Sequence, residues 1–72
     1  MEPLVDTVVL AAVRRGQRHT GQLARVSPLP GLKLFASLRR LERDGLLVCR
    51  RRLYRVTTAG EEALRVRRLE LR

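Results

Sequence analysis

Aromatic residues are scarce in this chain of 72 residues, which contains one Phe, one Tyr and no Trp. Proteins that bind single-stranded nucleic acid usually stack the bases on several aromatic side chains, so the composition disfavours that function. Long apolar runs are also absent. The longest extends from Val8 to Val13, far below the roughly 20 residues that a membrane-spanning helix requires. We therefore expect neither a single-strand binder nor a transmembrane protein.

Cysteine and histidine occur once each, as Cys49 and His19. A lone cysteine cannot form an internal disulfide, and a single imidazole beside it does not make a zinc site of the usual kind. No Ser-His-Asp set, paired carboxylates or glycine-rich phosphate loop can be assembled from the sequence. We therefore expect no metal, no cofactor and no enzymatic activity. The amino terminus has no secretory signal pattern, which predicts a cytoplasmic protein associated with the nucleoid.

Positive charge is what the chain has in excess. Sixteen Lys and Arg residues stand against seven Asp and Glu residues, giving a formal net charge of +9. Such an imbalance favours a polyanionic partner, with nucleic acid as the first candidate and an anionic membrane surface as the second. The apolar residues are mostly Leu, Val and Ala, enough for one small core. We expect a single domain over residues 1–72.

The first part of the chain predicts two helices of different length. Apolar residues recur at helical spacing until Gly16, so we expect a helix over Pro3–Arg15. Its apolar arc is wider than one small core needs, which predicts a homodimer formed through this helix. Thr20 is the expected N-cap of a short second helix that ends before Pro28.

The clearest helical pattern follows over Leu32–Asp44, just before Gly45. The residues expected to face the core are Leu34, Phe35, Leu38 and Leu41. The residues expected on the opposite, exposed face are Lys33, Ala36, Ser37, Arg40 and Arg43, with Arg39 at its edge.

Two short alternating segments then predict a β-hairpin. Leu47 and Cys49 stand at alternate positions, as on one face of a first strand. Tyr54 and Val56 stand at alternate positions in the same way, as on one face of a second strand. We expect Cys49 to lie opposite Tyr54 and Leu47 opposite Val56. A two-residue turn would favour Gly or Asn, which are absent here, so the expected loop has four residues. Thr57 is the expected N-cap of a last helix.

This order of elements is that of a winged helix-turn-helix, an α+β and mostly helical fold with three core helices, a short two-stranded wing and a C-terminal helix. Two segments, Leu34–Leu47 (LFASLRRLERDGLL) and Tyr54–Leu64 (YRVTTAGEEAL), resemble the PadR and MarR-type bacterial regulators. The resemblance covers residues 20–64, with Val56 where leucine is usual. It implies a DNA-binding domain.

The charge distribution agrees with this resemblance. Between Lys33 and Arg55 there are eight basic and two acidic residues, so this third of the chain carries +6 of the +9 charge. We expect sequence-specific binding of double-stranded DNA by a small transcriptional regulator, with the helix at about 32–44 in the major groove and the wing at about 47–56 on the backbone.

Three groups of side chains are expected to contact DNA. The expected base readers are Lys33, Ser37 and Arg40, beside Ala36 on the same face. The expected sequence-independent phosphate contacts are Arg39, Arg43, Arg50, Arg51, Arg52 and Arg55. Thr20 and Gln22, at the amino end of the second helix, are expected to hold a further phosphate.

Two other functions fit the same composition. A winged helix can be a protein-interaction module that binds an acidic partner, because the fold alone does not determine function. The basic and apolar residues from Leu64 to Arg72 would suit a membrane surface, but their helical pattern is weak, and we expect no membrane binding.

Overall fold

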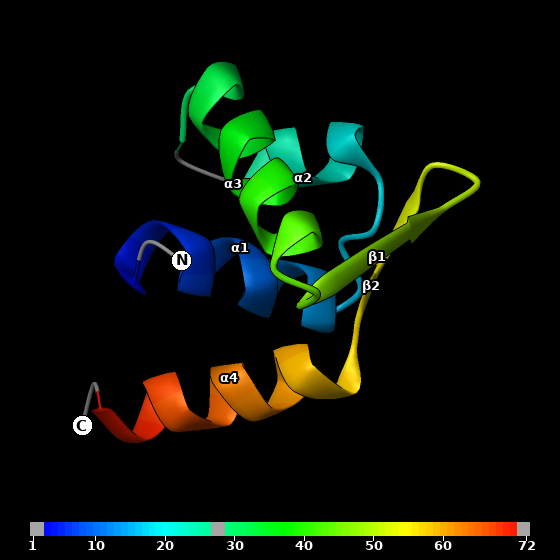
Figure 1. Cartoon of the computed structure of the whole chain (residues 1–72). Helices are drawn as coiled ribbons and strands as arrows, with labels where there is room; N and C mark the ends of the chain where they lie inside the picture. The colour runs from blue at the N-terminus through cyan, green and yellow to red at the C-terminus, as the bar shows by residue number, and fades with distance from the viewer. Residues whose placement is uncertain (1–2, 27–28, 71–72) are drawn as a thin grey trace.

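The computed structural model describes residues 3–26 and 29–70. In chain order its elements are α1 (Pro3–Arg14), α2 (Thr20–Val26), α3 (Gly31–Arg43), β1 (Leu47–Arg50), β2 (Leu53–Val56) and α4 (Thr58–Glu70). The strands pair in one antiparallel sheet, and their turn projects away from the helices (Figure 1). The predicted mostly helical α+β fold is confirmed at this level. No helix among the described residues is long and apolar enough to cross a membrane.

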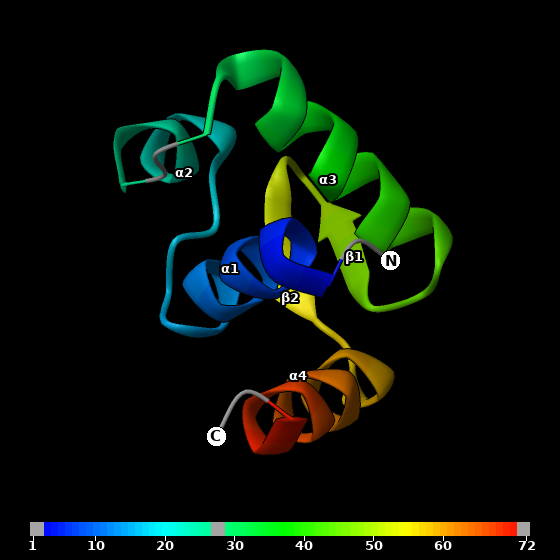
Figure 2. The same cartoon turned by 90° about the vertical axis from the view of Figure 1, so that its left-hand side faces the viewer.

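Helix α1 lies at the centre of the molecule. It runs between α3 and α4 in both views (Figure 1 and Figure 2) and contacts α2, α3, β2 and α4. Its wide apolar arc is therefore largely covered by the same chain, and Leu10 is fully buried. Leu4 and Val8, in contrast, are 67% and 48% exposed. Only a small part of the arc remains for a partner.

Glycine ends both α1 and α3 as predicted. Gly16 and Gly45 have φ angles of 111° and 77°, in the region that favours glycine. At the end of α3, the Gly45 N–H donates to the Glu42 carbonyl at 3.1 Å and the Leu46 N–H donates to the Leu41 carbonyl at 2.9 Å. This pair of bonds is a Schellman motif, which satisfies carbonyl groups at the helix end.

The hairpin has the predicted register but not the predicted loop. Leu47 pairs with Val56 and Cys49 with Tyr54, as expected. Arg50 also pairs with Leu53, so the loop contains two residues and the expectation of four is wrong.

The turn residues Arg51 and Arg52 both adopt positive φ angles, 53° and 67°. Such a primed turn matches the twist of the two strands, and the shorter loop gains one more strand pair. Left-handed backbone costs a non-glycine residue about 1–2 kcal/mol, so the turn is strained at two successive positions.

The expected cap of α2 is wrong. The His19 carbonyl accepts the first helical hydrogen bond, from the Leu23 N–H at 3.0 Å, so Thr20 lies inside the helix. The side chain that caps α2 is Gln22, whose Oε1 accepts from the N–H groups of Arg18 at 3.0 Å and His19 at 3.1 Å. A glutamine three residues after the cap residue is the returning half of a capping box.

The expected cap of α4 is confirmed. Thr57 Oγ1 accepts from the Gly60 N–H at 3.0 Å and donates to the Gly45 carbonyl at 2.6 Å. Gly60 is buried so close to the hairpin that a Cβ there would overlap the Leu46 carbonyl oxygen. The spacing Thr-x-x-Gly therefore anchors the start of α4 on the segment that joins α3 to β1.

Candidate nucleic-acid interface

The inner face of α3 is rotated from the predicted one. Its buried residues are Leu34, Ser37, Leu38 and Leu41. Phe35, which we expected in the core, is 50% exposed, whereas Ser37, which we expected on the surface, is fully buried. Both expectations are wrong. Tyr54, the other aromatic residue, is buried as expected, and this burial raises the pKa of its hydroxyl, with Cys49 and Glu42 acting in the same direction.

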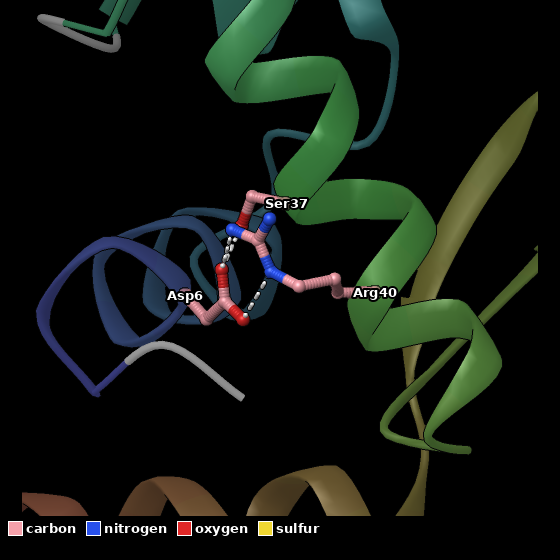
Figure 3. Close-up of polar contacts among 3 residues, drawn as sticks. All are labelled: Asp6, Ser37 and Arg40. Atoms are coloured by element: carbon pink, nitrogen blue, oxygen red, sulfur yellow. Dashed lines mark hydrogen bonds and ion pairs between the residues drawn. The ribbon is translucent and has the colours of Figure 1, made fainter.

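A buried carboxylate on α1 explains this rotation (Figure 3). Asp6 is completely buried, and its Oδ1 accepts from Ser37 Oγ at 2.5 Å and from a terminal nitrogen of Arg40 at 2.9 Å. Arg40 Nε donates to the other carboxylate oxygen at 3.2 Å. A charge inside a protein is tolerated when it is paired and hydrogen-bonded, so these contacts draw Ser37 and Arg40 toward α1.

Two of the expected base readers are thus bound to α1. The Arg40 side chain is 27% exposed and borders a small hollow of about 110 Å³ together with Lys33 and Ala36. The spacing of residues in the sequence indicates this arrangement. Asp6 precedes the buried Val9 and Leu10 by three and four residues, which places it on the inward stripe of α1.

The outer face of α3, opposite the buried stripe, consists of Leu32, Phe35, Ala36, Arg39 and Arg43, all exposed. Arg39, which we expected at the edge of the exposed face, therefore lies in its middle together with Arg43. The Arg39 guanidinium lies over the Phe35 ring at 5.6 Å from its centroid, a cation–π contact that orients both side chains. Arg43 Nε lies 3.4 Å from Asp44 Oδ1, yet its side chain remains 71% exposed. This face is both cationic and apolar.

The hairpin places its arginines outward. Arg50, Arg51, Arg52 and Arg55 are all exposed, and Arg55 lies on the strand face opposite the buried Tyr54. Arg52 borders a hollow of about 340 Å³ together with Thr20 and His19, so the turn and the amino end of α2 approach one another. Thr20 is exposed there, whereas the side-chain Oε1 of Gln22 accepts from the N–H groups of Arg18 and His19 and so caps α2.

Comparisons with models of protein families, with curated proteins and with solved structures found no match. The resemblance to PadR and MarR-type regulators, carried by Leu34–Leu47 and Tyr54–Leu64, stays a prediction from the sequence.

Proposed function

We propose that this protein binds double-stranded DNA as a winged helix-turn-helix and acts as a small transcriptional regulator in the cytoplasm. In this proposal the outer face of α3 enters the major groove, and the hairpin turn contacts the phosphate backbone. The order of elements, the exposed cationic face of α3 and the net charge of +9 support it.

The observation that carries the proposal is the turn at Arg51 and Arg52. Both residues hold positive φ angles, and within the described residues no carboxylate pairs with either side chain. Asn and Gly would form the same turn with less strain. Strained backbone that persists in a fold is often found at functional sites. Two exposed guanidinium groups on a projecting turn suit phosphate binding.

The outer face of α3 supplies a revised set of base contacts. Arg39 and Arg43 replace Arg40 and Ser37 as candidate readers, since an arginine can bind the O6 and N7 edge of guanine with two hydrogen bonds. Phe35 and Ala36, which are exposed on the same face, would contact the methyl groups of thymine in this proposal. Lys33 is also exposed and stays a candidate. Ser37 and Arg40 act through the orientation of α3.

Fluorescence anisotropy with labelled duplexes tests this proposal, using random DNA and a site obtained by selection from a random library. Replacing Arg51 and Arg52 together by Ala should weaken binding to both duplexes. The slope of log affinity against log salt should fall by about two units, one for each lost phosphate contact. Arg65→Ala removes one charge from α4 and should leave the slope unchanged.

Arg39→Ala should behave differently from the turn variant. We expect a loss of about 1–3 kcal/mol on the selected site and a much smaller loss on random DNA. Equal losses on every duplex would indicate a general basic surface. No loss from any of these variants would contradict DNA binding.

A protein-interaction module is the second candidate function. Leu32 is 87% exposed and Phe35 is 50% exposed, so the outer face of α3 presents apolar side chains beside its arginines. Such a face would also fit an acidic protein partner with an apolar centre. A loss of partner binding in Phe35→Ala, with DNA affinity unchanged, would favour this function over the first.

We also infer that two copies of the chain pair through α1. Leu4 and Val8 are exposed near its amino end, and Val66 on α4 is 43% exposed. The amino end of α1 and the carboxyl end of α4 lie on the same side of the molecule (Figure 1). A two-fold dimer would match a palindromic DNA site. Light scattering should show a dimer at about 100 μM and a monomer for Val8→Lys, and a wild-type monomer would contradict the inference.

A further inference from the structure

The single phenylalanine of the chain, Phe35, lies outside the core and is 50% exposed on the outer face of α3. The core is built mainly from leucine and valine side chains, with Tyr54 as its aromatic member. An aromatic side chain carries a large apolar area, and such side chains contribute strongly to interfaces as well as to cores. The exposed ring is therefore available for an apolar contact with a partner of the chain.

This ring and an arginine form one structural unit. Phe35 and Arg39 are four positions apart, a spacing that places both on the same face of a helix. The guanidinium carbon of Arg39 lies over the ring, 5.6 Å from its centroid. Among the described residues, no carboxylate forms an ion pair with Arg39. Its N–H groups therefore remain for an external acceptor, and the ring limits the directions in which they point.

The two parts of this unit match different groups in the major groove of DNA. Guanine presents O6 and N7, which together accept two hydrogen bonds from the planar guanidinium of an arginine. The apolar group that a base edge presents in this groove is the 5-methyl group of thymine. Base pairs are stacked about 3.4 Å apart. When Arg39 lies in the plane of a guanine, the ring beside its guanidinium is therefore at the level of a neighbouring base pair.

We propose that the outer face of α3 selects a guanine whose neighbour on the same strand is a pyrimidine with a 5-methyl group. Arg39 binds the guanine, and Phe35 packs against the methyl group of the neighbour. The inference rests on the proposed DNA binding and adds a defined base step to it. A cytosine methylated at C5 carries the same methyl group as thymine, so binding at this step depends on cytosine methylation. Unmethylated cytosine leaves the ring without an apolar partner.

Deoxyuridine in place of thymine removes only the methyl group and tests the contact directly. The duplex is the site selected from the random library, measured by fluorescence anisotropy at one salt concentration. Deoxyuridine beside the guanine should weaken binding about fourfold, which corresponds to the burial of one methyl group, about 0.8 kcal/mol. A thymine separated from that guanine by one base pair is the matched control. Deoxyuridine at the control position should leave the affinity unchanged.

Methylated cytosine is the second probe. Cytosine, with guanine opposite, takes the place of the thymine beside the guanine. The duplex should bind about fourfold more tightly when this cytosine is methylated at C5 than when it is not. Methylation of a cytosine outside the step should have no effect.

Protein variants assign the effect to the ring. Phe35→Ala should lower the ratio of thymine to deoxyuridine affinity from about fourfold to about one, with affinity for random DNA unchanged. Leu32→Ala removes another exposed apolar side chain from the same face and should keep the fourfold ratio. Phe35→Leu keeps an apolar side chain but removes the ring that orients Arg39. It should weaken the preference for guanine over adenine by about two- to fivefold, and it provides a second variant if Phe35→Ala does not fold.

Three results would overturn the inference while DNA binding stands. They are a selected site without such a step, equal affinities for the thymine and deoxyuridine duplexes, and a fourfold ratio that persists in Phe35→Ala. Failure of the wild type to bind any duplex is a different result, because it would contradict the proposed function and this inference together.

Discussion

The α1–α3 junction and the turn between β1 and β2 hold arginine side chains in two contrasting environments. At the junction, Arg40 is mostly buried and donates two hydrogen bonds to the carboxylate of Asp6. At the turn, Arg51 and Arg52 are exposed and hold left-handed backbone. At the junction the charge of Arg40 is paired inside the fold. At the turn the charges are exposed and the backbone that carries them is strained. The strained residues are therefore the better guide to function.

The same contrast holds along α3 itself. Arg39 and Arg40 are neighbours in the sequence, yet Arg39 lies on the exposed Phe35 ring and Arg40 reaches the buried Asp6. The contacts of Arg40 fix how α3 is rotated on α1. That rotation decides which side chains form the outer face. The junction therefore determines the composition of the proposed DNA-reading surface without contacting DNA.

The largest expected effect comes from breaking the junction. Asp6→Ala leaves Arg40 without its carboxylate and Ser37 without its acceptor, and we expect a loss of about 3–5 kcal/mol in the free energy of unfolding. Urea denaturation followed by circular dichroism measures it. Replacing Asp6 by Leu and Arg40 by Met together removes both charges and should restore most of the stability. A loss below about 1 kcal/mol in Asp6→Ala would mean that the pair is not formed.

The apolar part of the junction is the next most sensitive. Leu38 is fully buried, and Leu38→Ala should cost about 2–5 kcal/mol because it leaves a cavity between α3 and its neighbours. Leu32→Ala is the control on the same helix, since Leu32 is 87% exposed, and it should change stability by less than about 0.5 kcal/mol. Similar melting temperatures for the two variants would contradict the orientation of α3.

The base of the hairpin is closely packed, whereas its turn is exposed. Gly60→Ala would place a methyl group against the Leu46 carbonyl, and we expect a loss of about 1–3 kcal/mol. Gly21→Ala in α2 meets no atom within 4 Å and should instead stabilise the protein by about 0.5–1 kcal/mol. Thermal denaturation of the two variants compares them directly. A Gly60→Ala variant that is as stable as the wild type, or more stable, would show that α4 does not approach the hairpin this closely.

Features fixed by local chemistry were predictable from the sequence. Gly16 and Gly45 end their helices because both need a backbone that glycine adopts readily. Thr57 caps α4 because its hydroxyl reaches an unsatisfied N–H group. The strand register followed from the alternation of side chains between Leu47 and Val56.

Features that depend on distant partners were not predictable. The helical pattern placed Ser37 outside and Phe35 inside, because a polarity pattern treats every polar residue as exposed and does not contain the buried carboxylate of Asp6. The turn was expected to be longer because Arg51 and Arg52 disfavour left-handed backbone, but strand twist and the pair between Arg50 and Leu53 outweigh that preference. The candidate site changed accordingly, from Arg40 to Arg39 on α3.

The smallest effect among the main substitutions tests the turn, and it is a gain of stability rather than a loss. Replacing Arg51 by Asn and Arg52 by Gly installs the pair that this turn type favours, so the free energy of unfolding should rise by about 1 kcal/mol. For a domain of this size, that corresponds to a rise in Tm of about 4–8 °C. If the proposed function holds, DNA affinity should fall and the salt slope should decrease by about two units, because both proposed phosphate contacts would be lost. Replacing both residues by Lys keeps the charge and the strain, so stability and the salt slope should stay near those of the wild type. A more stable Asn-Gly variant with undiminished DNA affinity would show that the strain at the turn is unrelated to binding.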